Sequence, residues 1–450
     1  MRVQPRRRRP PTRLRLVTLV AATALTAACS SAPSPGGATG AASGWAGTSA
    51  GPTTPASSGP SSVPTSVPTS VPTSSDSASS TPTGNATGTP TGTPTGSTPT
   101  SCAPAIVARM DAGERAGQLL MVGLDAGASR TSLDALVARR HLGGVILLGG
   151  WGDGVDRVRA TTRHLASLAS AKDTAGLGML LAVDQEGGAV QQLRGDGFSR
   201  MPSATAQGQG SATALTADAT RWAGQLRAAG VNVNLAPVAD TVPASLGRAN
   251  GPIGQYDRQF SSDPERVARM VGAFVAGMRA GGIASTVKHF PGIGRVTGNT
   301  DVTASGITDR RTTVDDPYLE PFRTGIQDGV ELVMVGSAVY SRIDPGTNAP
   351  FSRAIVTDLL RDRLSYDGVV ITDDVGAAKA VADVPVGQRA TRFIAAGGDI
   401  TLTARPSTVP TMHEAITEKM AADPAFAAKV EAATTRVVDL KLRMGLARCS

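Results

Sequence analysis

The chain has 450 residues, a sequence pI near 9.8 and a formal net charge of +8. The positive charge is concentrated in the first 28 residues, which contain seven arginines and no acidic residue. Subtracting these seven from +8 leaves about +1 for the rest of the chain, which excludes the basic footprint of a nucleic-acid-binding protein.

The N-terminus has the pattern of an export signal. Arginines extend to Arg15, and the apolar stretch that follows, residues 16–28, is too short to span a bilayer. The small residues before Cys29 resemble the lipobox of bacterial lipoproteins. We therefore predict a signal peptide at 1–28 and acylation of Cys29, which would anchor the protein to the outer face of the cytoplasmic membrane. Cleavage without lipidation, giving a secreted protein, is the alternative.

Residues 29–101 have the composition of a flexible linker. Ser, Thr, Pro, Gly and Ala dominate, short Ser-Val-Pro-Thr repeats begin at Ser62, and Asp76 is the only charged residue. Such a segment cannot bury enough apolar surface to offset the entropy lost on ordering. We predict a disordered stalk that holds a domain at 102–450 away from the membrane.

Two further cysteines, Cys102 and Cys449, stand at the ends of this predicted domain. Domain termini often lie close together, and an exported chain reaches an oxidising compartment. We therefore expect a disulfide between them, with two free thiols as the alternative.

Short apolar runs alternate with segments of helical periodicity throughout the domain. Strands are predicted at residues 119–124, 144–148, 179–184, 233–240, 283–289, 332–336, 369–373 and 400–403. Helices are predicted at 132–140, 153–171, 212–229, 263–280, 318–327, 352–365 and 388–396, followed by a long helical tail at 411–443. Eight strand–helix units predict a (β/α)₈ TIM-like barrel. A doubly wound open sheet is the alternative, because periodicity does not separate the two.

Charged residues follow several of these strands, at the end where barrels carry their sites. The polar residues at these strand ends are Asp184, Glu186, Asp240, Lys288, His289, Asp373 and Asp374. Asp399 precedes the eighth strand, at the opposite end, and is expected to be structural. The histidines His141, His164, His289 and His413 show no metal-ligand spacing, so no metal is predicted. Converging carboxylates without metal ligands suit glycoside cleavage.

These motifs resemble glycoside hydrolase family 3, specifically its single-barrel β-N-acetylhexosaminidases. The resemblance covers most of residues 105–445 and rests on the segments at 117–123, 183–188, 231–240, 257–260, 288–292 and 371–374. It implies a retaining exo-β-N-acetylglucosaminidase that needs no cofactor and acts, as a monomer, on GlcNAc-terminated peptidoglycan fragments. A β-glucosidase-like hydrolase of other sugars and a non-catalytic glycan-binding lipoprotein are the alternatives.

The resemblance also implies roles for individual residues. Asp373 matches the nucleophile. Asp184, Arg258, Lys288 and His289 match residues that hold the terminal sugar through its hydroxyl groups, which suits carboxylate acceptors and cationic donors.

The roles of the other acidic residues at the strand ends are inferred from their positions in the sequence. Asp374 is expected to cap the turn that follows it, and Asp240 to be structural. Glu186 is either a sugar contact or a partner of Arg258.

One segment departs from the family pattern. In the hexosaminidases, the loop after Lys-His-Phe-Pro-Gly carries an Asp-Ser/Thr-His dyad whose histidine is the acid/base, whereas this chain has Asn299-Thr300-Asp301 there. In one interpretation Asp301 is the acid/base, with a pKa raised by desolvation and by Asp373 about 5 Å away. In the other, the loop has lost its acid, and the barrel binds glycans or cleaves only activated substrates. An acid from elsewhere is a third possibility. The composition of the loop, residues 292–306, predicts mobility and closure over substrate.

Overall fold

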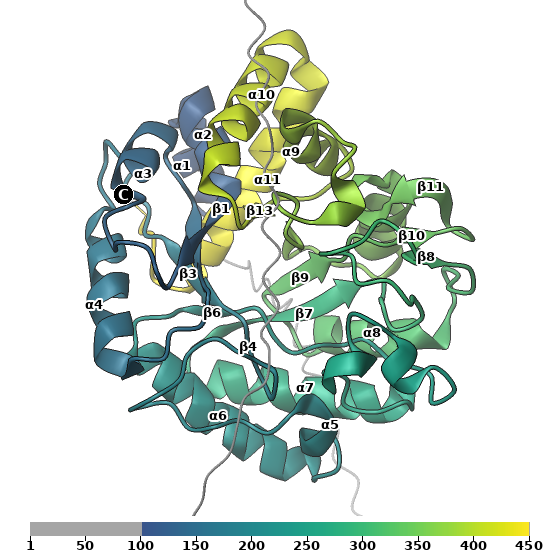
Figure 1. The fold of residues 1–450 in the computed structure, drawn as a ribbon. Coiled ribbons are helices and arrows are strands. Elements are labelled where there is room, and N and C mark those ends of the chain that lie inside the picture. The colour runs from purple at the N-terminus through teal and green to yellow at the C-terminus, as the bar shows by residue number, and fades with distance from the viewer. Residues whose placement is uncertain (1–100, 450) are drawn as a thin grey trace, which may run out of the picture. The chain divides into compact units, whose positions relative to one another are not determined.

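The computed structural model describes residues 101–449, and the predicted signal peptide, Cys29 and the stalk lie outside them. Eight parallel strands form the centre in the order β12-β9-β7-β6-β3-β2-β1-β13 (Figure 1). Their bounds are β1 Leu120–Asp125, β2 Gly144–Leu148, β3 Leu180–Val183, β6 Val233–Asn234, β7 Ala284–Phe290, β9 Leu332–Val335, β12 Val369–Thr372 and β13 Thr401–Thr403. A bridge between Ile371 and Ile400 joins the two edges. The predicted TIM-like barrel is thus confirmed.

Helices surround the barrel (Figure 1). They are α3 Asp134–Arg140, α4 Gly154–Ser167, α6 Ala212–Ala228, α7 Pro264–Ala280, α8 Glu320–Gln327, a π-helix at Ala354–Arg363, α9 Val386–Ala395, α10 Val409–Ala422 and α11 Pro424–Arg443. Short 3₁₀ helices lie at Gly247–Ala249, Gly254–Tyr256, Pro317–Leu319, Ala349–Phe351, Lys379–Val381 and Pro406–Thr408. The strands are buried on both faces, as parallel strands covered by helices must be, which explains the apolar runs of β2, β3 and β9.

The helical tail differs from its prediction, because it is two helices rather than one. Pro424 disfavours the helical conformation in the residue before it, and Asp423 adopts an extended backbone with φ −136° and ψ 98°. The Asp423 side chain then accepts a hydrogen bond from the amide of Phe426 and caps α11.

The fourth predicted strand is also shorter than expected. Only Val233–Asn234 pairs as β6, and the chain then leaves the sheet before Pro237, which has no amide hydrogen to donate to a ladder. A single bridge between Val238 and Lys288 continues the contact with β7. This early exit brings Asp240 beneath the loop that follows β7.

Several small elements escaped prediction because they are too short to show a period. Helices α1 Ala103–Ala108, α2 Ala112–Gln118 and α5 Ala204–Gln207 are among them. So are the hairpin strands β4 Gln185–Gly187 and β5 Val190–Gln191, and the sheet of β8 Thr308–Asp309, β10 Val339–Tyr340 and β11 Asp344–Asn348. Both small sheets are built from segments that follow barrel strands, and so they lie at the carboxyl end of the barrel.

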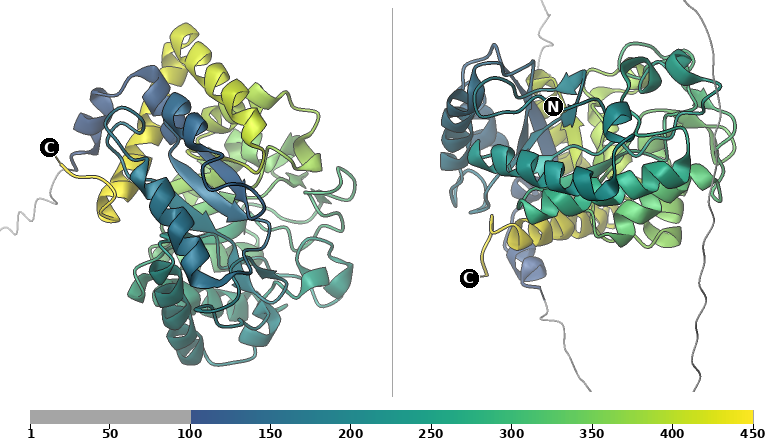
Figure 2. Two further views of the ribbon diagram at one scale, coloured as in Figure 1. Left: turned by 60° about the vertical axis from the view of Figure 1, so that its left-hand side comes forward. Right: turned by 90° about the horizontal axis from the view of Figure 1, so that it is seen from below.

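The two ends of the described chain meet at the amino end of the barrel. Cys102 and Cys449 form a disulfide, the pairing expected from the sequence. Helix α1 packs on α11, and its apolar side chains meet Leu177, which lies just before β3. Figure 2 shows α1 and the C-terminal segment together on this side.

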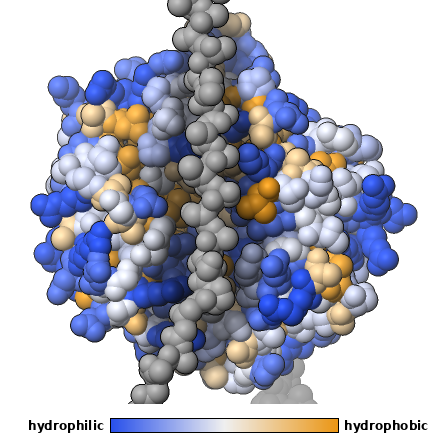
Figure 3. Space-filling model, viewed as in Figure 1, coloured by the Kyte–Doolittle hydropathy of each residue, from blue (hydrophilic) through white to orange (hydrophobic). Residues whose placement is uncertain are grey.

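The exposed surface and the hydropathy of the helices indicate which molecules the described residues can contact. The face shown in Figure 3 is mostly hydrophilic, with small apolar patches between hydrophilic residues. Within residues 101–449, the large hydrophobic side chains that are exposed are Tyr256 and Val302. No helix in this part of the chain combines the length and the hydropathy that crossing a bilayer requires.

Candidate active site

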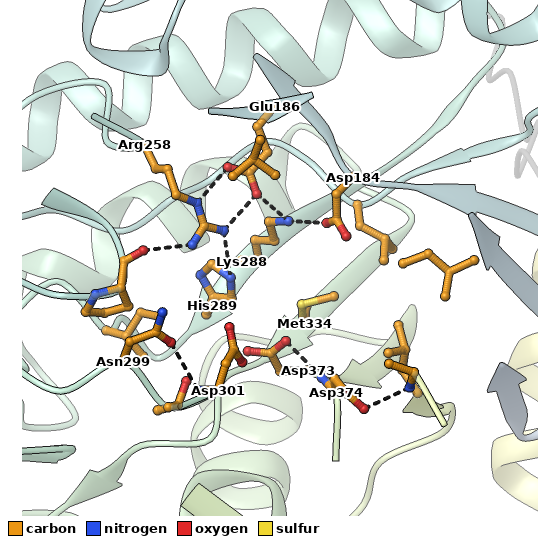
Figure 4. A pocket seen from close by; sticks show the side chains of 18 of the residues that line it. Asp184, Glu186, Arg258, Lys288, His289, Asn299, Asp301, Met334, Asp373 and Asp374 are labelled. Carbon is orange, nitrogen blue, oxygen red and sulfur yellow. Dashed lines mark hydrogen bonds and ion pairs between the residues drawn. The ribbon is translucent and has the colours of Figure 1, made fainter. Parts of the chain in front are cut away.

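A cavity of about 260 Å³ opens at the carboxyl end of the barrel. This volume lies slightly below the range of roughly 300–1,000 Å³ typical of sites for drug-sized ligands, so the cavity suits a small ligand. All six residues predicted to act on substrate line it: Asp184, Arg258, Lys288, His289, Asp301 and Asp373. They come from the ends of three strands, β3, β7 and β12, and from two loops, and Figure 4 shows them converging on one space.

A buried network of charges forms one wall. The Lys288 ammonium lies 2.5 Å from Asp184 Oδ1 and 2.6 Å from Glu186 Oε1. The Arg258 guanidinium binds Glu186 in a bidentate manner, with Nε and Nη2 at 2.9 and 2.8 Å from its two oxygens. Buried charges must be paired in this way, because desolvation of an isolated ion is costly. The two carboxylates and the two cations of this wall therefore have no net charge.

Glu186 holds this network together rather than facing the cavity freely. Its side chain is 3% exposed, against 19% for Asp184. Burial alone would raise the pKa of Glu186, but Arg258 and Lys288 outweigh it and lower the pKa to about 2. The two roles left open for Glu186 are thus resolved in favour of a partner for Arg258, and of Lys288 as well.

His289 is fixed by a carboxylate behind it. Its Nδ1 lies 2.7 Å from Asp240 Oδ2, and the fully buried Asp240 also accepts hydrogen bonds from the amides of His289 and Ile293. Because Asp240 is an acceptor, Nδ1 of His289 carries a proton in this contact. Nε2 lies 3.4 Å from Arg258 Nη2. Asp240 thus orients the imidazole that lines the cavity.

The two adjacent aspartates after β12 have different surroundings. Asp374 Oδ1 accepts hydrogen bonds from the amides of Gly376 and Ala404, so Asp374 caps the turn as expected. Asp373 accepts one hydrogen bond from the amide of Asp374, at 2.9 Å, and lines the cavity. Figure 4 shows its carboxylate facing Asp301 across the pocket.

Asp301 occupies the loop position where the family pattern has a histidine. The residue as a whole is exposed, but its carboxyl group faces into the cavity (Figure 4). Burial and then the negative charge of Asp373 raise the pKa of Asp301 to about 6, with His289 and Arg258 opposing the rise. A carboxyl with this pKa holds its proton in part near neutral pH and can donate it.

The cavity therefore combines a proton donor, a carboxylate and a set of hydroxyl-binding charges. Within residues 101–449, no group of three or more His, Cys, Asp or Glu side chains is arranged to hold a metal ion. The motifs located the residues of the cavity. The sequence left Glu186 open as a sugar contact or a partner of Arg258 and predicted a structural Asp240, but it did not show that Glu186 also holds Lys288 or that Asp240 orients His289. Those roles depend on contacts between different strands, although both residues stand at the predicted strand ends.

Comparisons with known proteins agree with this arrangement. The family model described as the glycosyl hydrolase family 3 N terminal domain matches residues 112–440. A beta-hexosaminidase of Xanthomonas oryzae pv. oryzae is 35% identical over 245 residues, which cover 53% of this chain and 71% of that protein. A beta-hexosaminidase of Stenotrophomonas maltophilia is 38% identical over 237 residues, covering 51% and 68%.

Solved structures are similar over most of the described chain. The crystal structure of a beta-N-acetylhexosaminidase from Beutenbergia cavernae has 46% sequence identity and a TM-score of 0.72, covering 74% of this chain and 99% of that one. A family 3 beta-N-acetylglucosaminidase from Paenibacillus sp. has 27% identity and a TM-score of 0.65, covering 76% and 64%.

Proposed function

The chain belongs to glycoside hydrolase family 3, and from this premise we propose that it is a retaining exo-β-N-acetylglucosaminidase that releases terminal GlcNAc from peptidoglycan fragments. That it is a glycoside hydrolase follows from the family match and from its hexosaminidase relatives. The names of the relatives support GlcNAc as the sugar. The observation that carries the mechanism is the pair formed by Asp373 and a protonatable Asp301 in one cavity.

In the first step, an Asp373 oxygen attacks the anomeric carbon of the terminal sugar. The bond from that carbon to the glycosidic oxygen breaks, and Asp301 gives its proton to the departing oxygen. The sugar is then esterified to Asp373, and Asp301 is ionised. In the second step, Asp301 takes a proton from water, the water oxygen attacks the anomeric carbon, and Asp373 is released. Two inversions give overall retention of configuration.

The sugar is held by the charged wall opposite this pair. Asp184 accepts hydrogen bonds from hydroxyl groups, and Lys288 and Arg258 donate them. Because Glu186 fixes both cations, the donors are in place before substrate arrives, and little ordering entropy is lost on binding. His289, oriented by Asp240, contributes Nε2 to the same wall.

The place of action is proposed from the N-terminal sequence. The arginine-rich segment, the apolar run and Cys29 support export and a lipid anchor on the outer face of the cytoplasmic membrane, with secretion as the alternative. Cell-wall fragments are the GlcNAc-bearing substrates available at that location. We further propose that the protein acts as a monomer.

The direct test is incubation of the protein with a GlcNAc–MurNAc disaccharide from peptidoglycan, followed by NMR of the first product. We expect free GlcNAc that appears first as the β-anomer. Initial α-anomer would contradict the retaining mechanism. Saturable binding without product would identify a glycan-binding protein, and faster release of glucose from matched glucosides would identify a hydrolase of another sugar.

A further inference from the structure

The loop that follows the nucleophile, residues 374–385, is held from one side by a single arginine. Arg389 lies in the first turn of α9 and is 7% exposed. Its guanidinium donates hydrogen bonds to the carbonyl oxygens of Val375, Ala382 and Val384, at 2.7, 3.2 and 2.8 Å. No carboxylate among residues 101–449 forms an ion pair with it, so its hydrogen bonds go to the backbone of the loop. Hydrogen bonds from one buried side chain thus reach both ends of the loop.

The same loop is hydrogen-bonded to the segment that carries Asp301. The amide of Lys379 donates to the carbonyl of Asp301 at 3.1 Å, and the amide of Ala380 donates to the carbonyl of Thr300 at 3.0 Å. The side chain of Asn299 accepts a hydrogen bond from the amide of Asp301 and closes the turn. The main chain bearing the acid is thus joined directly to the main chain that follows the nucleophile.

Two asparagine side chains form further hydrogen bonds with the two loops. Asn348 at the end of β11 donates from Nδ2 to the carbonyls of Ala380 and Ser337, at 3.2 and 2.9 Å. Buried Asn250 donates to the carbonyls of Ile293 and Val296, both at 2.8 Å, at the base of the loop that carries Asp301. The composition of residues 292–306 suggested a mobile lid, but these contacts fasten the loop at its base and beside its acid.

We infer that Arg389 is a positioning residue for proton donation: it shapes loop 374–385 so that the loop holds the Asp301 carboxyl group opposite Asp373. This inference rests on the proposed role of Asp301 as the acid. Proton transfer depends steeply on geometry, and a misplacement of about 1 Å can cost about a hundredfold in rate. The sugar, in contrast, is held by Asp184, Arg258 and Lys288, which come from other loops and strands. A change at Arg389 should therefore affect proton donation more than sugar binding.

The test compares Arg389→Lys and Asn348→Ala with a matched control, Arg392→Lys, in the full-length protein. Arg392 is an exposed arginine of the same helix that stacks on the Phe351 ring instead of contacting the loop. Each variant is assayed on a GlcNAc–MurNAc disaccharide, whose leaving group needs a proton, and on 2,4-dinitrophenyl N-acetyl-β-glucosaminide, whose leaving group does not.

We expect Arg389→Lys to lower kcat/KM on the disaccharide by about tenfold to a hundredfold, with little change in kcat/KM on the dinitrophenyl substrate. The comparison uses kcat/KM because this quantity reports the first step, in which only the disaccharide needs a proton from Asp301. The alkaline limb of its pH profile should move to lower pH, because an Asp301 carboxyl that drifts into water regains a more ordinary pKa. Asn348→Ala should show the same pattern more weakly, and it serves as the test if Arg389→Lys does not fold. Arg392→Lys should match the wild type.

Equal losses on the two substrates, or an unchanged alkaline limb, would overturn the positioning role. The variant Asp301→Asn separates this failure from that of the proposed function. If Asp301→Asn loses activity selectively on the disaccharide and Arg389→Lys does not, only the role of Arg389 is wrong. If Asp301→Asn shows no selective loss, the assignment of the acid fails, and the inference fails with it.

Discussion

The two carboxylates that face each other in the pocket are stabilised to different extents. Asp373 accepts a hydrogen bond from the amide of Asp374. Within residues 101–449, no donor hydrogen-bonds to the Asp301 carboxyl, and burial and the charge of Asp373 raise the pKa of Asp301 to about 6. One carboxylate is thus ready to attack and the other to donate a proton, the division of labour that a retaining glycosidase requires.

The substitution Asp301→Asn tests this division. It should lower kcat/KM on the disaccharide by roughly 10²–10⁴-fold, the range typical of a lost general acid, and lower it far less on the dinitrophenyl substrate. In the wild type the protonated carboxyl is the active form, so activity should fall as pH rises through about 6. This alkaline limb should be absent from Asp301→Asn.

Asp383→Asn is the matched control, because Asp383 is an exposed aspartate on the loop after β12 and does not line the cavity. It should leave both substrates and the pH profile unchanged. A fall of the same size on the two substrates in Asp301→Asn would indicate that Asp301 binds or orients the sugar and does not donate the proton.

Among single residues, the sequence predicted which side chains reach the cavity but left open most of what holds them, including whether Glu186 pairs with Arg258 or contacts the sugar. Lys288 and Asp373 follow apolar strands within family motifs, so their place at the rim could be inferred. The bidentate pair of Arg258 with Glu186, and the hydrogen bonds of Arg389, join segments far apart in sequence. No local pattern encodes such pairs, because they depend on how the strands are ordered around the barrel.

At the scale of elements, prediction succeeded where a segment had enough length to show its period. The strands β2 and β12 are uninterrupted apolar runs, and the structure has them within a residue of the predicted bounds. The break at Asp423 was missed because helical periodicity continues across it, although Pro424 marked the boundary. Two-residue strands such as β8 carry no detectable period. The small sheet of β8, β10 and β11, which follows the loop that carries Asp301, could therefore not be predicted.

Helix α11 contributes a feature that should make stability depend on pH. Lys441 is fully buried, and its Nζ donates to Gln118 Oε1 at 2.6 Å and to the carbonyl of Gly143 at 3.0 Å. Burial lowers the pKa of Lys441 from 10.5 to about 7. Between these two values the unfolded chain binds the proton and the folded chain does not, so this residue makes stability fall as pH falls from about 10.5 to about 7.

The variant Lys441→Met should remove this dependence. The free energy of unfolding of the wild type, relative to the variant, should rise between pH 7 and pH 10 by at most roughly 1.4 kcal/mol per pH unit. Urea unfolding of both proteins at several pH values measures the difference. Lys429→Met, at an exposed position of the same helix, should track the wild type. If the difference in unfolding free energy between the wild type and Lys441→Met is constant across this pH range, Lys441 remains charged in the folded protein.

At the scale of the whole molecule, the barrel has two functionally distinct ends. The cavity lies at the carboxyl end of the strands, while Cys102 and Cys449 join the two ends of the described chain beside the segment that enters β3. The bond closes a loop across 347 positions, and α1 is packed on α11 next to it. The mouth of the pocket and the disulfide therefore lie at opposite ends of the barrel.

The double substitution Cys102→Ser with Cys449→Ser should therefore affect stability and not catalysis. Loss of a native disulfide typically costs about 2–5 kcal/mol, mainly because the unfolded chain gains freedom. We expect a lower unfolding free energy in urea with kcat/KM unchanged at 25 °C. A large fall in kcat/KM for the folded variant would mean that the two ends of the barrel are coupled.

The most direct measurement for the account as a whole is covalent trapping of the nucleophile. The protein is treated with a fluorinated GlcNAc inactivator that slows hydrolysis of the glycosyl-enzyme, and the labelled peptide is identified by mass spectrometry. We predict one sugar per chain, attached to Asp373, and no labelling of Asp373→Asn. Attachment to Asp184, Asp301 or any other residue, or turnover of disaccharide by Asp373→Asn at the wild-type rate, would contradict the proposed mechanism.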